Sequence, residues 1–154
     1  MTANATNIFP AGEFPRHACM HDLFTAQAAR TPDATALVFN ERRLSYRALD
    51  QQADALGHAL KALGIGTKDL IGICAERAPE LPLAILAVLK AGAAYVPLEP
   101  TCPDDRRCAI LADAEPAALL TQRHLVSRFA AWSRPMICLD DEIALSETRG
   151  RSEL

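Results

Sequence analysis

The sequence is poor in aromatic residues and in glycine. Aromatic residues make up 5% of the 154 positions, and glycine occurs 7 times. The low aromatic content argues against a protein that binds single-stranded nucleic acid, because such proteins stack bases on aromatic side chains. The net charge of −3 points the same way, because a nucleic-acid-binding domain usually carries a basic face. We therefore expect no nucleic-acid partner.

Long hydrophobic runs are also missing. The longest strongly apolar run, residues 81–89, is far shorter than the ~20 residues that a membrane-spanning helix needs. The N-terminus lacks the basic start and apolar core of a secretory signal. We expect a cytoplasmic protein without a membrane partner, in which the five cysteines are reduced.

A phosphate-binding glycine loop is absent from the sequence. In a dinucleotide-binding fold, Gly-x-Gly-x-x-Gly follows the first strand of the unit. Here the apolar run 70–74 is followed by Ala-Glu-Arg-Ala-Pro, whose side chains would keep the backbone away from a pyrophosphate. Gly64 and Gly66 form a close glycine pair, but they precede that strand. We interpret them as a helix end and a turn.

Residue types that bind metals or act as nucleophiles are present but scattered. No second cysteine pair completes a zinc site, and we do not expect the histidines to form one. A solvent-exposed side chain is the main interpretation for His58, and apolar packing is the main interpretation for the cysteines. A reactive cysteine near Arg106 and Arg107 is the weaker alternative. The residues concerned are His17, His21, His58, His124, Cys19, Cys74, Cys102, Cys108 and Cys138.

Acidic and hydroxyl side chains give no catalytic constellation either. Asp104 and Asp105 are expected to cap a helix start, with an acid/base pair as the alternative. The acidic stretch 140–142 is expected to be a solvated loop, with cation binding as the alternative. Ser45 and Ser127 lack the setting of a nucleophile elbow. From the residues we predict no catalytic, cofactor-binding or metal-binding position.

Periodicity predicts an α/β fold, with a mostly parallel sheet and flanking helices. Residues 1–16 are expected to be a linker, 17–140 a domain, and 141–154 a polar tail. Expected helices cover 20–30, 46–63, 82–91, 105–112 and 123–131. Expected strands cover 36–39, a return strand from 44, then 70–74, 94–98, 117–121 and 136–139.

The pattern is strongest in the helix 46–63. Ser45 is expected at its N-cap and Gly64 just past its end, in the left-handed conformation. An apolar stripe should face the core and a polar set should face water. The stripe is Tyr46, Leu49, Ala53, Leu56, Leu60 and Leu63, and the polar set is Arg47, Asp50, Gln51, Asp54 and Lys61.

Several segments resemble in sequence the adenylation (AMP-binding) domains of nonribosomal peptide synthetases, in the acyl-adenylate-forming superfamily. Residues 21–33 resemble the opening helix of these domains. Residues 44–50, with Ala53, Leu60 and 63–66, resemble their first core motif, and residues 89–100, Leu-Lys-Ala-Gly-Ala-Ala-Tyr-Val-Pro-Leu-Glu-Pro, resemble the second. The match continues through Asp113-Ala114 and 119–121, so it covers roughly 14–140.

The resemblance implies a parent activity. The family uses ATP and Mg²⁺ to activate an amino acid as aminoacyl-AMP, and transfers it to the thiol of a carrier protein. Its phosphate loop would begin shortly after Leu154, and its substrate pocket, ribose-binding aspartate and catalytic lysine lie further on. We therefore expect 17–140 to be the N-terminal part of an adenylation domain, truncated before the phosphate loop and acting as inactive scaffold.

Some positions depart from the family pattern. Cys102 stands where tyrosine is usual, Arg107 where leucine is usual, and Glu99 where aspartate is usual. Arg107 falls on a face that is normally packed, so this departure bears on how the helix around it docks.

Two other functions stay open at this point. The chain could be an interaction module that complements a separately encoded remainder, because the helix over 81–89 is apolar on nearly all sides. It could also be a small independent α/β enzyme, an idea weakened by the missing phosphate loop. The downstream remainder and carrier-protein modules are the expected partners, and an uncovered sheet edge is an expected aggregation hazard.

Overall fold

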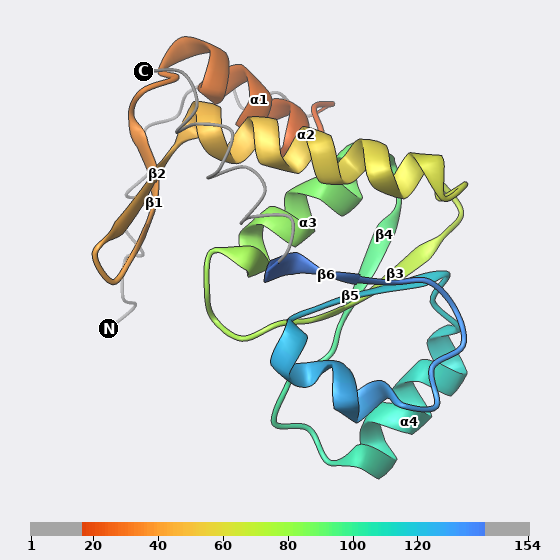
Figure 1. The fold of residues 1–154 in the computed structure, drawn as a ribbon. Helices are drawn as coiled ribbons and strands as arrows, with labels where there is room; N and C mark the ends of the chain where they lie inside the picture. The colour runs from red at the N-terminus through yellow and green to blue at the C-terminus, as the bar shows by residue number, and fades with distance from the viewer. Residues whose placement is uncertain (1–16, 141–154) are drawn as a thin grey trace, which may run out of the picture.

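The computed structural model describes residues 17–140 (Figure 1). The expected linker 1–16 and polar tail 141–154 lie outside the described residues. The elements in chain order are α1 (Met20–Arg30), β1 (Thr35–Phe39), β2 (Arg42–Ser45), α2 (Tyr46–Ala62), β3 (Leu70–Cys74), α3 (Glu80–Ala91), β4 (Ala94–Pro97), α4 (Asp104–Ala114), β5 (Ala118–Thr121), the 3₁₀ helix η1 (Arg123–Phe129) and β6 (Met136–Cys138).

The predicted parallel sheet is confirmed. Four strands pair in the order β4-β3-β5-β6, and all three pairings are parallel. β3 lies inside the sheet, where Ile71 is in register with Tyr95 of β4 and Ala118 of β5. The predicted hairpin is also present, as the antiparallel pair β1-β2. The fold is therefore α/β, as the alternation of strands and helices indicates.

Helices cover both faces of the parallel sheet (Figure 1). α2 and α3 form the larger core cluster with Ile71 and Leu120, while the smaller cluster joins Leu119, Leu125 and Phe129 on the other face. Neighbouring residues of β5 thus point to opposite faces, and every residue of that strand is buried. A strand covered on both faces reads as a continuous apolar run, which explains why it shows no polar alternation.

Both predicted ends of α2 are confirmed. The Ser45 hydroxyl accepts a hydrogen bond from Ala48 N at 3.2 Å, as an N-cap should. Gly64 has φ 83° and follows the last turn, and Ile65 N donates back to Leu60 O at 3.2 Å. This is the Schellman arrangement, which satisfies carbonyls that the helix end leaves free. The predicted burial of Leu63 is wrong: it is 51% exposed, because the helix has ended at this point.

The two central helices approach each other closely. A Cβ placed on Gly57 of α2 would lie 3.2 Å from the Ala87 carbonyl oxygen of α3, so the absence of a side chain permits this contact. The prediction that Asp50 faces water is wrong, because its side chain is largely buried and bonds to Lys90 of α3. α3 ends at Gly92, as predicted.

The segment after β4 docks in spite of its unusual residue. α4 packs with Ile110 and Leu111 half-buried against the smaller core cluster. Arg107 is 3% exposed, and its guanidinium lies over the Phe129 ring, 5.2 Å from the centroid. A cation–π contact therefore accommodates the arginine in this packed position. The helix predicted at 123–131 is a 3₁₀ helix. None of the helices between residues 17 and 140 has the length and apolarity to cross a bilayer.

Candidate functional site

The place to look for a ligand is the carboxyl edge of the parallel sheet. In open α/β sheets, ligands bind outside the carboxyl ends of the strands, where the strand order reverses direction. This position, the switch point of the sheet, lies between β3 and β5. The chain moves from β3 out to β4 and then returns to the other side of β3. The last residues of these two strands, Cys74 and Thr121, are in register.

Cys74 and Thr121 are both buried at this edge. Cys74 is 1% exposed, and burial raises the pKa of its thiol, although the charges of Arg107 and Arg128 act in the opposite direction. A nucleophilic cysteine needs the reverse, a depressed pKa and an accessible sulfur. Cys74 is therefore a packing residue, in agreement with the interpretation from sequence.

The loops that follow the two strands are tied to each other. The Gln122 side-chain oxygen accepts a hydrogen bond from Glu76 N at 2.8 Å, across the gap between the β3 and β5 loops. The Glu76 carboxylate also lies 3.3 Å from the imidazole of His124. Arg123 N donates to the Asp140 carboxylate. Two backbone N–H groups at the switch point are thus bound by the protein's own side chains.

This arrangement holds the loops together, and it uses two backbone N–H groups of the kind that bind an anion. A phosphate site needs backbone N–H groups that point at the ligand. At this edge, the N–H groups of Glu76 and Arg123 are occupied by Gln122 and Asp140. Gln122 is 5% exposed, and it belongs to no sequence motif from which this role could have been predicted. Its role depends on the pairing of β3 with β5.

The acidic start of α4 is used for ion pairing. The predicted capping role of Asp104 is wrong, because Pro103 occupies the N-cap position. The Asp104 carboxylate instead accepts hydrogen bonds from Arg107 at 2.7 Å and Arg128 at 3.1 Å, and these hold its pKa below the usual range. Asp105 lies in the first turn of the helix, where a negative charge is favourable.

The other candidates from the sequence are dispersed. Arg107 and Arg128 donate to the backbone carbonyl of Cys102, while Cys108 is an exposed free cysteine. His58 and Ser127 are exposed, and Ser45 is used as a helix cap. The acidic stretch beyond Asp140 lies outside the described residues. The structure brings none of these together into a catalytic set within 17–140.

One cluster was missed by sequence reasoning. Cys19, His21 and Asp22 at the start of α1 each place a ligating atom within 4.8 Å of the others. His21 stands four positions after His17, the His-x-x-x-His spacing, so a search for paired histidines points to this segment but not to Cys19 and Asp22. The signal that could have found them is the mixture of sulfur, nitrogen and oxygen donors over four positions.

Comparison with known proteins gives consistent matches. A family profile described as AMP-binding enzyme matches residues 24–152. Malpinin synthetase of Mortierella alpina is 47% identical over 110 residues, which cover 71% of this chain and 1% of that protein. Tyrocidine synthase 3 of Brevibacillus parabrevis is 43% identical over 122 residues, which cover 79% of this chain and 2% of that protein.

Solved structures give the same result. The nonribosomal peptide synthetase FmoA3, bound to alpha-methyl-L-serine-AMP, matches with TM-score 0.75 and 32% identity over 79% of this chain and 14% of its own. The N-terminal subdomain of Klebsiella oxytoca NpsA, in complex with 3-hydroxyanthranilyl-AMSN, matches with TM-score 0.72 and 29% identity over 81% of this chain and 32% of its own. The chain thus spans a small part of each relative.

Proposed function

This chain belongs to the AMP-binding enzyme family and corresponds to part of a nonribosomal peptide synthetase adenylation domain, and we propose that its role is to act as scaffold for that domain. The parent activity would be ATP-dependent activation of an amino acid as aminoacyl-AMP, with Mg²⁺, followed by transfer to a carrier-protein thiol. The observation that supports this role is the match across residues 24–152, combined with a switch point that the protein's own side chains close.

Catalysis of adenylation by this chain alone is not part of the proposal. Charge that develops on the α-phosphate must be stabilised by oriented donors, cations or a metal ion. The loss of one such donor typically costs about 100–1000-fold in rate. The sequence contains no glycine-rich phosphate loop, and the N–H groups at the switch point are occupied. We expect the chain by itself to have no measurable activity.

An exchange assay tests the inactive role directly. The full chain is incubated with ATP, Mg²⁺, labelled pyrophosphate and each of the amino acids in turn. We expect no ATP–pyrophosphate exchange above the rate without protein. Exchange that depends on one amino acid and tracks with the purified chain would contradict the scaffold proposal.

A chimera tests whether the scaffold is competent. Residues 24–140 replace the aligned segment in an active adenylation domain of tyrocidine synthase 3. We expect the chimera to keep the amino-acid preference of the host, because the grafted segment supplies no pocket residue. Its matched control carries Lys90→Met in the grafted segment, which should lower stability without changing the preferred amino acid. A folded chimera without exchange, or with a changed preference, would contradict the proposal.

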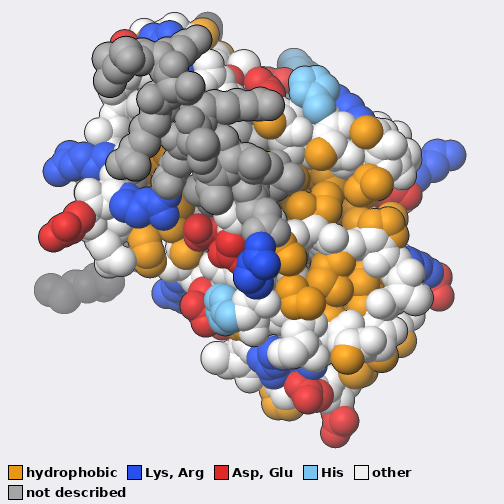
Figure 2. Space-filling view, viewed as in Figure 1, with side chains coloured by type: hydrophobic (Ala, Val, Ile, Leu, Met, Phe, Trp, Pro, Cys, Tyr) orange, Lys and Arg blue, Asp and Glu red, His pale blue; other side chains and the backbone are white. Residues whose placement is uncertain are grey.

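A second function, complementation of a separately supplied remainder, has its own supporting observation. Of the two edge strands of the parallel sheet, β4 and β6, β6 has three half-buried residues and a partner on one side only. Figure 2 shows hydrophobic side chains gathered on the face where β6 lies. Uncovered strand edges and apolar patches favour association. In size-exclusion chromatography, we expect the chain to co-elute with the remainder of the tyrocidine synthase 3 adenylation domain. Two separate peaks at micromolar concentration would reject this function.

A further inference from the structure

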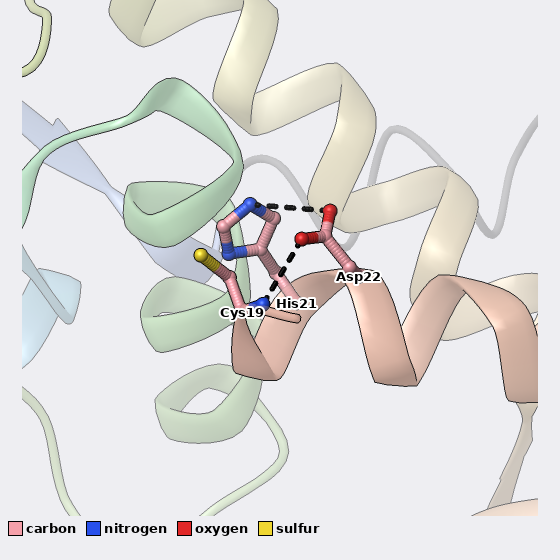
Figure 3. A group of neighbouring side chains, drawn as sticks. All are labelled: Cys19, His21 and Asp22. Atoms are coloured by element: carbon pink, nitrogen blue, oxygen red, sulfur yellow. Dashed lines mark hydrogen bonds and ion pairs between the residues drawn. The ribbon is translucent and has the colours of Figure 1, made fainter. Parts of the chain in front are cut away.

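Three ligating side chains meet at the start of α1, away from the switch point (Figure 3). Cys19 and Asp22 are exposed and His21 is half-buried. One sulfur, one imidazole nitrogen and one carboxylate oxygen lie within 4.8 Å of one another. In Figure 3 the imidazole ring lies between the thiol and the carboxylate. None of the three residues takes part in the contacts described at the carboxyl edge of the sheet.

The helix start accounts for the position of Asp22, and it leaves one carboxylate oxygen available. Asp22 Oδ2 accepts a hydrogen bond from Cys19 N at 3.1 Å, which is the carboxylate half of a capping interaction. The other oxygen, Oδ1, lies 3.6 Å from His21 Nε2. The cap therefore holds the carboxylate near the imidazole without using the oxygen that faces it. The backbone geometry that starts α1 also preorganises these donors.

The donor set selects a class of ion. Thiolate and imidazole favour zinc and similar transition ions, whereas Mg²⁺ and Ca²⁺ prefer oxygen ligands. Zinc bonds of about 2.0–2.3 Å in a tetrahedral site require ligand atoms about 3–4 Å apart. The 3.6 Å between His21 Nε2 and Asp22 Oδ1 lies in that range, and the ligand atoms of all three residues lie within 4.8 Å of one another, so side-chain rotations would bring the three donors to one centre.

We propose that Cys19, His21 and Asp22 form a binding site for a zinc-class divalent ion. Three protein ligands leave a fourth tetrahedral position for water or another donor. His17, two residues before Cys19 and exposed, is the nearest further imidazole in the sequence. When the ion binds, the Cys19 thiol loses its proton to solvent and the thiolate bonds to the metal. The site is independent of the proposed scaffold role.

The test is a titration of the full chain, without a polyhistidine tag, with Co²⁺ as a spectroscopic probe. A cysteine ligand gives a thiolate-to-metal charge-transfer band, which ligation by oxygen or nitrogen alone does not give. We expect this band to saturate at one Co²⁺ per chain and to disappear when Zn²⁺ is added. Absence of the band, or saturation at several ions per chain, would overturn the proposal.

Variants assign the ligands. Cys19→Ser keeps a good N-cap residue, so the helix start should persist while the charge-transfer band is lost. Asp22→Asn keeps an oxygen that can accept the capping bond. We expect His21→Asn and Asp22→Asn to weaken Co²⁺ binding by at least about tenfold. Even the mutation of a residue that only hydrogen-bonds to a metal ligand typically lowers metal affinity about 10–100-fold. Far-UV circular dichroism confirms that each variant is folded.

Two matched controls complete the experiment. Cys108→Ser removes another exposed cysteine, and His58→Asn removes another exposed histidine. Both should retain the band and the affinity of the unmodified chain. Loss of the band in either control, or its retention in Cys19→Ser, would assign the metal to other residues and overturn the proposal. Because the readout is metal binding, the outcome does not depend on adenylation activity.

Discussion

Lys90 of α3 donates a hydrogen bond from Nζ to Asp50 Oδ1 of α2 at 2.7 Å, and the ion pair is largely buried. The same ammonium lies 2.6 Å from Asp54 Oδ1, and Thr25 of α1 donates to Asp50 at 3.1 Å. Three helices therefore meet at one charged group. This contact lies beside Gly57, where α2 and α3 approach closely, since a Cβ there would be 3.6 Å from Lys90 Cβ.

Replacement of Lys90 by methionine tests the strength of this contact. Lys90→Met nearly keeps the length of the side chain but leaves the largely buried Asp50 without its cation. We expect the free energy of unfolding to fall by about 2 kcal/mol, the range for hydrogen bonds to charged groups. Urea denaturation measures the change. The control Lys61→Met alters an exposed lysine on α2 and should stay within about 0.5 kcal/mol of the unmodified chain. Equal effects of the two substitutions would contradict the assignment.

The same ion pair predicts a dependence on pH. Burial lowers the pKa of Lys90, but the hydrogen bonds and charges of Asp50 and Asp54 outweigh it, so its pKa lies above the ordinary value. A raised folded-state pKa stabilises the protein below the unfolded-state pKa, about 10.4, and this stabilisation is lost as pH rises through the folded-state value. The stability difference between the unmodified chain and Lys90→Met should be constant near neutral pH and should shrink only above about pH 10.4. A difference that shrinks between neutral pH and that value would contradict the sign.

Asp104 should titrate at unusually low pH. The hydrogen bonds from Arg107 and Arg128 lower the pKa of its carboxyl. Because the folded-state pKa is depressed, its contribution to stability is present above the unfolded-state pKa and is lost as pH falls through the folded-state value. Carbon-detected NMR of the carboxyl should show a midpoint below about 3.9, and Arg128→Gln should raise it. Arg134→Gln, which removes bonds to the carbonyls of Glu115 and Pro116, should leave it unchanged.

Two substitutions of Arg107 separate the contribution of its charge to stability from that of its side-chain volume. Its guanidinium contacts the Phe129 ring, and Nη2 donates to Asp104 and to the Arg128 carbonyl. Arg107→Ala removes both packing and hydrogen bonds, and we expect a loss of about 2 kcal/mol. Arg107→Leu refills the buried volume and should stay within about 1 kcal/mol of the unmodified chain, because the side chain of its partner Asp104 is 74% exposed and stays hydrated. Thermal and urea denaturation should agree, and a larger loss for leucine than for alanine would contradict this view.

Two glycines two residues apart should respond differently to alanine. Gly64 has a positive φ of 83°, whereas no positive φ occurs at Gly66, and neither has an atom within 4 Å of an added Cβ. Gly64→Ala should cost about 1–2 kcal/mol through backbone strain alone. Gly66→Ala should be neutral or slightly stabilising, because it restricts the unfolded chain. Urea denaturation of the pair separates the two effects, and equal values would show that the α2 C-terminus does not need the left-handed residue.

Features that depend on neighbouring residues in the chain could be predicted from the sequence. The Ser45 cap, the Gly64 turn and the apolar stripe around Leu56 all arise within one helix, where spacing fixes geometry. The four strands of the parallel sheet are predicted by their apolar runs. The domain boundaries stay a prediction, because the segments outside 17–140 are not described.

Contacts that depend on which elements become neighbours could not be predicted. The pattern of α2 alone places Asp50 toward water, because it does not show that Lys90, 40 positions away, packs against it. The cation–π contact of Arg107 requires η1 to lie beside α4. The closure of the switch point by Gln122 requires β3 to pair with β5. In each case the partner depends on which helices and strands pack together in the fold.

The interior position of β3 also sets an order of assembly. β3 is the first strand of the sheet to leave the ribosome, yet its two neighbours, β4 and β5, are made later. During synthesis, one side of β3 must wait until Thr121 has emerged, while β4 can dock as soon as α3 has formed. Vectorial synthesis therefore exposes an apolar strand for the time needed to make about fifty residues, a few seconds at 5–20 residues per second.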